Sequence, residues 1–156
     1  MSVDFPSSRA QGQKLIVAIL VGGFVAGTFD LVLAFLMYGR GMPRGIASGL
    51  LGSRAFQGGM ASWILGVLLH YFIAFGAAAV YCVSSWKLRF LKDNWVVCGL
   101  FYGIAIYLVM NLVVLPLSAV PFKVGPFSVP GMIHGLLVHM IFIGLPIAYS
   151  LRRFAK

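Results

Sequence analysis

The sequence predicts an all-α integral membrane protein folded as a four-helix bundle. Of its 156 residues, 61% are hydrophobic and only 10% are charged, whereas a typical soluble domain is about 45–50% apolar and about 25% charged. The chain has no glutamate, and its apolar residues fall into four long stretches. A soluble fold of this size cannot bury so much apolar surface. The composition therefore excludes a water-soluble enzyme, a disordered chain and a disulfide scaffold.

Each apolar stretch is long enough to cross a bilayer, because about 20 residues at 1.5 Å rise span a hydrocarbon core about 30 Å thick. The run after Lys14 is too long for the apolar region of a signal peptide, about 7–15 residues, and is expected to remain as the first span. Only short tails and loops are left over, so we expect residues 1–156 to form a single transmembrane domain. The expected spans are residues 15–38, 61–86, 95–115 and 131–151.

The basic residues predict the orientation, because lysine and arginine in short loops stay preferentially on the cytoplasmic side. Eight lie on one side of the predicted spans and four on the other. We therefore expect both termini to be cytoplasmic. The net charge of +9 then reflects topology and attraction to anionic lipid headgroups, and no nucleic-acid binding is expected because the chain has no sizeable aromatic and basic surface. The eight are Arg9, Lys14, Lys87, Arg89, Lys92, Arg152, Arg153 and Lys156, and the four are Arg40, Arg44, Arg54 and Lys123.

The two halves of the chain share short motifs. The segment Gly66–His70 has a counterpart at Gly135–His139, 69 residues later, and Gly23–Gly27 has one at Gly99–Gly103, 76 residues later. This pattern predicts two tandem helical hairpins related by a pseudo-two-fold axis along the membrane normal. Chance similarity in a glycine- and leucine-rich chain is the alternative. The paired glycines are expected to let helix backbones approach closely.

Five polar side chains inside the spans lie in the half of the bilayer opposite the predicted cytoplasmic side. Counted at 1.5 Å per residue from the outer ends of the spans, Asp30, His70 and His139 lie roughly 12–13 Å deep, and Asn111 and His134 roughly 5–8 Å deep. An ionisable group inside a span is costly unless it faces other helices, a cavity or a partner. We therefore expect the first three to form a polar chamber open to the outer face, with the other two at its mouth.

Several chemistries fit this cluster. The residues can pair only to lock the helix packing, or they can handle a proton, an ion or a small solute, because histidine exchanges protons near neutral pH. Two histidines and a carboxylate can hold a divalent metal, and two histidines on different helices can ligate a haem b or line a quinone site. Sequence motifs typical of catalytic metal, phosphate or nucleophile sites are missing, so we expect a protein that is not an enzyme.

The loops carry further expectations. In the first loop, residues 46–51 predict a short interfacial helix, with Arg40, Arg44 and Arg54 contacting lipid headgroups or an anion. The third loop, residues 117–130, contains three prolines and is expected to lie extended over the outer surface as a lid.

Three residues within or near the spans complete the picture. Pro146 should kink the fourth span because proline lacks a backbone donor. Cys82 and Cys98 are expected near the reducing cytoplasmic side, where a disulfide does not persist, and to pack as small hydrophobic residues.

Four segments carry a resemblance: Gly27-Thr-Phe-Asp30, Ile46-Ala-Ser-Gly-Leu-Leu-Gly52, Leu69-His70 and Met110-Asn-Leu-Val-Val-Leu-Pro-Leu-Ser118. In these the chain resembles small four-span bacterial membrane proteins and is similar to the YagU-like inner-membrane proteins. The resemblance covers residues 15–153 and implies a bacterial inner-membrane location and no known reaction.

The functional expectation is a non-enzymatic membrane protein whose polar cluster handles a proton, ion or small solute. Because four helices make a thin pore wall, self-association or membership of a larger membrane complex is expected. A haem- or quinone-binding redox subunit and a structural accessory subunit remain as alternatives.

Overall fold

The computed structural model describes residues 8–122 and 128–155, and these ranges are helical with no strand. Four stretches in them are long and apolar enough to cross a membrane, Gln11–Tyr38, Gly59–Ser84, Trp95–Leu117 and Val129–Phe154. The chain is therefore a multi-pass helical membrane protein, as the composition predicts. The elements in order are α1 (Ser8–Tyr38), α2 (Met42–Leu51), a 3-10 turn η1 (Gly52–Phe56), α3 (Gly59–Ser84), α4 (Phe90–Asp93), α5 (Trp95–Val109), a π-helical segment η2 (Met110–Val114), α6 (Leu115–Leu117), α7 (Val129–Val138), a π-helical segment η3 (His139–Gly144) and α8 (Leu145–Phe154).

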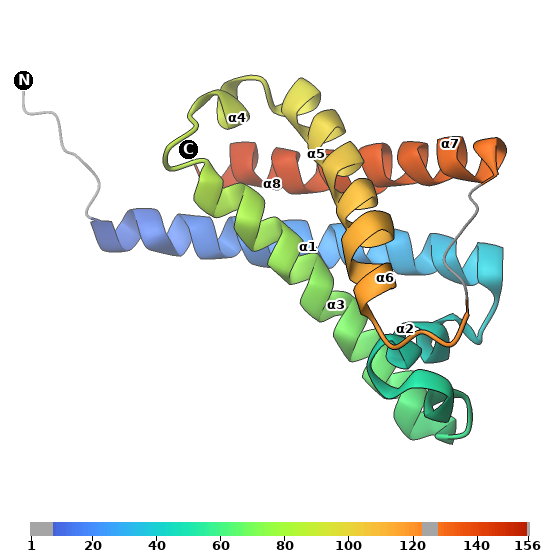
Figure 1. Cartoon of the computed structure of the whole chain (residues 1–156). Helices are drawn as coiled ribbons and strands as arrows, with labels where there is room; N and C mark the ends of the chain where they lie inside the picture. The colour runs from blue at the N-terminus through green and yellow to red at the C-terminus, as the bar shows by residue number, and fades with distance from the viewer. Residues whose placement is uncertain (1–7, 123–127, 156) are drawn as a thin grey trace, which may run out of the picture.

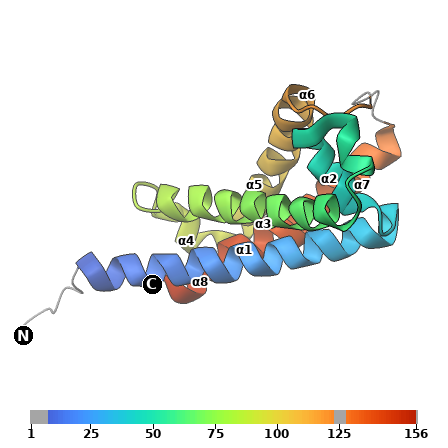
Figure 2. The same ribbon diagram turned by 90° about the horizontal axis from the view of Figure 1, so that it is seen from below.

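The helices pack in two crossed pairs. Helix α1 packs against α3 and also lies beside α8, and α5 packs against η3 and α8 (Figure 1). Figure 2 shows α3 running along α1, while α5 and α6 lead away from α1 toward the side on which α2 lies.

The loops meet at two opposite ends of the bundle. At one end Lys92 Nζ donates to the Ala155 carbonyl at 2.8 Å, which joins the second loop to the end of α8. At the other end Ala119 N donates to the Gly49 carbonyl at 2.8 Å, which joins the first loop to the segment after α6. We call these the α4 end and the α2 end. Four consecutive spans require this arrangement, because each span carries the chain to the opposite end of the bundle. The first and third loops therefore lie at one end, and the second loop and the end of α8 lie at the other.

The core lies where α1 meets α8. Ala18, Ile147 and Leu151 are fully buried there, and the Ser150 hydroxyl donates to the Ala18 carbonyl at 2.7 Å. A β-carbon at Gly22 would lie 3.3 Å from Ile147 Cα. Small residues therefore let the two backbones touch, as expected where lipid supplies no hydrophobic drive for helix association.

The four repeat glycines mark the crossing points within the two hairpins. A β-carbon at Gly23 would lie 3.0 Å from Phe75 Cα, and one at Gly99 would lie 3.0 Å from the Gly144 carbonyl oxygen. The two glycines are 76 residues apart and their partners 69 apart, which are the offsets of the sequence motifs. The hairpins α1–α3 and α5–α8 thus share a packing pattern, in agreement with the predicted tandem hairpins.

The symmetry between the hairpins is incomplete. Helices α1 and α8 touch through their backbones, but α3 and α5 meet through side chains: Tyr102 Oη donates to the Ala77 carbonyl at 2.7 Å, and the Tyr81 and Tyr102 rings lie 4.8 Å apart. A cleft remains between α3 and α5 at the α4 end.

Pro116 in the third span and Pro146 in the fourth each follow a π-helical segment. Segment η2 ends two residues before Pro116, and η3 ends two residues before Pro146. The fourth span accommodates Pro146 with this wide turn, and helix continues on both sides of it. A π segment is one of the recognised responses to a missing backbone donor.

The first loop forms the short helix that its sequence predicts. Helix α2 packs on the first half of α3, and a β-carbon at Gly66 would collide with the Pro43 carbonyl. Pro43 and Ala47 are buried, whereas Leu50 is exposed. Part of the predicted third-loop lid, residues 123–127, lies outside the described residues.

Candidate polar site at the α2 end of the spans

The contacts of the helices place three of the predicted polar residues at similar heights. His70 bonds to a carbonyl of α1 three residues before Asp30. Phe142 packs edge-on against Phe29 with ring centroids 5.8 Å apart. Because the fourth span runs antiparallel to α1, His139 then lies about two residues beyond Asp30 along α1. At 1.5 Å per residue the three heights differ by roughly 8 Å or less.

His70 joins α1 to α3. Its Nε2 lies 2.8 Å from the Gly27 carbonyl oxygen, and the next residue, Tyr71, shares a hydrogen bond of 2.9 Å with Thr28 Oγ1. Tyr71 also stacks on Phe24 at 5.8 Å. A β-carbon at Gly27 would lie 3.1 Å from the Tyr71 ring, so the bare glycine lets α3 approach close enough for both polar contacts.

His139 and Asn111 gather around Tyr107. His139 Nδ1 lies 2.8 Å from the Gly135 carbonyl oxygen of its own helix, and its ring meets Tyr107 edge-on at 5.3 Å. Asn111 Nδ2 donates to the Tyr107 carbonyl at 2.8 Å. Both polar groups are therefore satisfied by carbonyls one turn earlier in their own spans, and they lie at the contact between the third and fourth spans.

His134 lies apart from this group. Its Nε2 is 3.2 Å from Met37 Sδ, which links α7 to the end of α1. The residue is exposed, as its shallow predicted depth implies.

Asp30 has the most unusual surroundings of the five. It follows the buried Ala26 by one helical turn and is itself half-buried. No hydrogen bond or ion pair joins its carboxylate to another residue of the described chain. Because every fully buried side-chain oxygen or nitrogen in those residues has a partner, the carboxylate oxygens must reach the protein surface. A charged group at this depth without a partner is costly.

The arrangement bears on the metal and haem alternatives. Within residues 8–122 and 128–155, no three histidine, cysteine, aspartate or glutamate side chains are placed to hold a metal ion. The contacts of His70 lie between α1 and α3, and those of His139 between α5 and α7. A haem b with two axial histidines needs both on one macrocycle, and the haem alternative stays a prediction.

The arginines of the first loop lie at the α2 end. Arg44 Nε donates to the Gly59 carbonyl at 3.2 Å, and the Arg40 carbonyl accepts from Trp63 Nε1 at 3.1 Å. Arg40 and Arg54 are exposed. Their contact with lipid headgroups or an anion stays a prediction.

No family model, curated protein or solved structure matches the chain. The resemblance to the YagU-like proteins therefore stays a prediction, and function has to be argued from the residues.

Sequence reasoning missed three residues of this region: Thr28, Tyr71 and Tyr107. Thr28 and Tyr71 are sequence neighbours of the predicted site, and Tyr107 precedes Asn111 by one turn. Each has a hydroxyl that sequence alone does not orient. The sequence signal that could have found them is that each lies next to a predicted site residue or about one helical turn, 3.6 residues, away from one.

Proposed function

We propose that this multi-pass protein is a non-enzymatic protein of the bacterial inner membrane, with both termini cytoplasmic, that binds and releases a proton at Asp30. One observation carries the proposal: among the described residues, Asp30 is the only acidic side chain within the spans and has no partner. Ionisable residues inside spans mark ion pathways and proton relays, so an unpaired carboxylate there is a candidate functional group.

The hydrogen bonds of the neighbouring polar residues support the choice of Asp30 as the proton-binding group. His70, His139 and Asn111 each bond to a backbone carbonyl, His70 across to α1 and the other two within their own spans. Asp30 is left as the acidic side chain of the described spans that has no such bond.

The residues present favour the proton over a metal cation. Among the described residues, no three histidine, cysteine, aspartate or glutamate side chains are placed to hold a metal ion. A proton can be passed along hydrogen-bonded water or hydroxyl groups, so it does not need a site of several oxygen ligands.

The test measures proton movement across vesicles that contain the purified chain. With an enclosed pH-sensitive dye, the wild type and Asp30→Glu should speed the decay of an imposed pH gradient, and Asp30→Asn should not. His70→Phe serves as a matched control on the facing helix and should retain flux. If the wild type passes no protons, or if Asp30→Asn passes as many, the proposal is wrong.

Unfolding of the same variants separates this proposal from a structural accessory role. If Asp30 is unpaired, Asp30→Asn removes a costly charge, and the free energy of unfolding should rise or stay the same. If the carboxylate instead locks the packing, the variant should be less stable. A loss of stability with unchanged flux would support the accessory alternative.

A further inference from the structure

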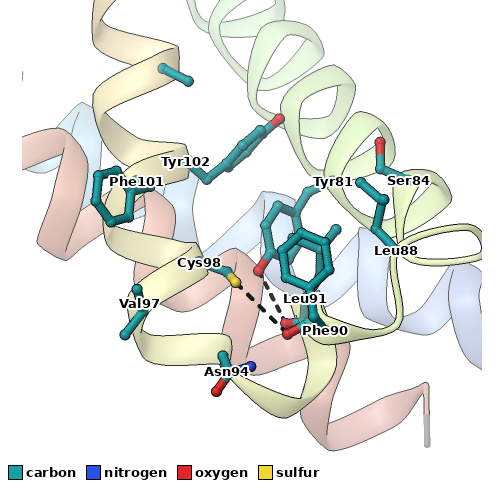
Figure 3. Close-up of a pocket in the computed structure, with 11 residues that line it drawn as sticks. Tyr81, Ser84, Leu88, Phe90, Leu91, Asn94, Val97, Cys98, Phe101 and Tyr102 are labelled. Atoms are coloured by element: carbon teal, nitrogen blue, oxygen red, sulfur yellow. Dashed lines mark hydrogen bonds between the residues drawn. The ribbon is translucent and has the colours of Figure 1, made fainter.

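A cleft lies between α3 and α5 at the α4 end. This open cleft has a volume of about 660 Å³, within the range of about 300–1,000 Å³ typical of small-molecule sites. Where α1 and α8 touch directly, α3 and α5 leave this space between them. Figure 3 shows the aromatic side chains of Tyr81, Phe90, Phe101 and Tyr102 around it.

The floor of the cleft has few free polar groups. Tyr81 Oη donates to the Leu91 carbonyl at 3.3 Å, Tyr102 Oη donates to the Ala77 carbonyl, and Cys98 Sγ lies 3.8 Å from the Phe90 carbonyl oxygen (Figure 3). The hydroxyl and thiol groups are thus turned to the backbone. The surface left for a ligand is apolar, which suits a hydrocarbon chain.

The rim of the cleft is basic. Leu88 and Phe90 line the cleft, while Lys87 and Arg89 alternate with them and are exposed. Within the described chain neither basic side chain makes a hydrogen bond or an ion pair. Two exposed basic residues without a partner in the described chain are therefore sequence neighbours of residues that line the cleft.

We propose that this cleft binds an anionic phospholipid, with an acyl chain between α3 and α5 and the phosphate at Lys87 and Arg89. Charge complementarity selects this occupant. A second copy of a chain with net charge +9 would bring the same basic rims together and be repelled. A zwitterionic lipid would carry its own positive group to the rim. The site lies at the opposite end from Asp30, so the proposal does not depend on the proposed proton site.

The first experiment measures lipid binding to the purified full chain in a neutral detergent. Native mass spectrometry follows titration with phosphatidylglycerol and, separately, with phosphatidylcholine of the same acyl chains. Phosphatidylglycerol should bind at least tenfold more tightly. At about 1 kcal/mol for each basic side chain near the headgroups, and a factor of ten for each 1.4 kcal/mol, the double variant Lys87→Gln/Arg89→Gln should lose about 30-fold in affinity.

A matched variant removes two exposed arginines from the other end of the molecule. Arg40→Gln/Arg54→Gln lowers the net charge equally and should leave phosphatidylglycerol binding unchanged. Equal binding of the two lipids, or equal losses in the two double variants, would overturn the proposal. A lipid-dependent rise in dimer mass would also overturn it, because a second copy would then occupy the face.

The second experiment tests whether the chain enters the cleft. Cys98 lines the cleft and is half-buried, whereas Cys82 is fully buried, so labelling with N-ethylmaleimide reports on Cys98. Bound phosphatidylglycerol should slow this labelling. Ala105→Trp, which fills the cleft, should slow labelling without lipid and weaken lipid binding. If saturating phosphatidylglycerol leaves the labelling rate unchanged, the cleft is not the acyl-chain site and the proposal is wrong.

Discussion

Replacing Gly103 by alanine should separate the third and fourth spans. A β-carbon at this position would lie 2.5 Å from Met140 Cα, whereas ordinary contact begins at 3.4 Å, so the backbones must move apart by roughly 0.9 Å. Overpacking of this kind costs about 1–3 kcal/mol. Alanine also favours helix over glycine by up to about 1 kcal/mol, which partly hides the packing cost in a single variant.

Gly76→Ala is the matched control for this substitution. Gly76 lies inside α3 and is exposed, and a β-carbon there would meet nothing within 4 Å. Both variants gain the same helix propensity, so the difference between them isolates the packing cost. Unfolding in mixed micelles with a rising fraction of sodium dodecyl sulfate, followed by circular dichroism, should place Gly103→Ala about 1–3 kcal/mol below Gly76→Ala. Equal stability would refute the close backbone contact.

Two further predictions concern polar contacts between helices. Ser150→Ala removes a buried hydroxyl that bonds across to Ala18 and should lower the free energy of unfolding by about 0.6–1.7 kcal/mol. The control, Ser84→Ala, removes a bond to Val80 in the same helix and should change the free energy of unfolding much less. Equal losses of stability in the same micelle assay would contradict the interhelical role of Ser150. A double-mutant cycle of Thr28→Val and Tyr71→Phe should give a coupling energy of about 0.6 kcal/mol for their 2.9 Å contact, and additive effects would show that the contact contributes nothing.

The architecture was predictable because apolar length alone identifies helices in a membrane. Every backbone polar group in lipid must form its hydrogen bonds within the protein, so a single long apolar segment is expected to form a helix. The repeat glycines were also readable, since Gly23 and Gly99 lie where their spacing implies close helix contacts. The boundaries differ modestly: α3 ends at Ser84 and the third span continues to Leu117.

The polar site was less predictable. The depth of a residue in the membrane can be counted along its span from the sequence, but the direction in which its side chain points cannot. Counting residues predicts similar depths for His70 and His139. Their convergence depended on helix rotation and crossing, which sequence does not fix. The cleft between α3 and α5 was not predicted for the same reason: it lies where these two helices diverge, and the crossing of helices cannot be derived from the sequence.

The bond between Ser150 and Ala18 joins residues separated by 132 positions, so the core closes late in synthesis. At about 5–20 residues per second, roughly 7–26 s pass between the appearance of the two partners. During that interval the side of α1 that packs on α8, which carries Ala18 and Gly22, has no partner, and lipid or the insertion machinery must shield it. A ribosome stalled before the fourth span would therefore hold a nascent chain in which this face of α1 is uncovered. We expect this form to be the one most exposed to quality-control proteases.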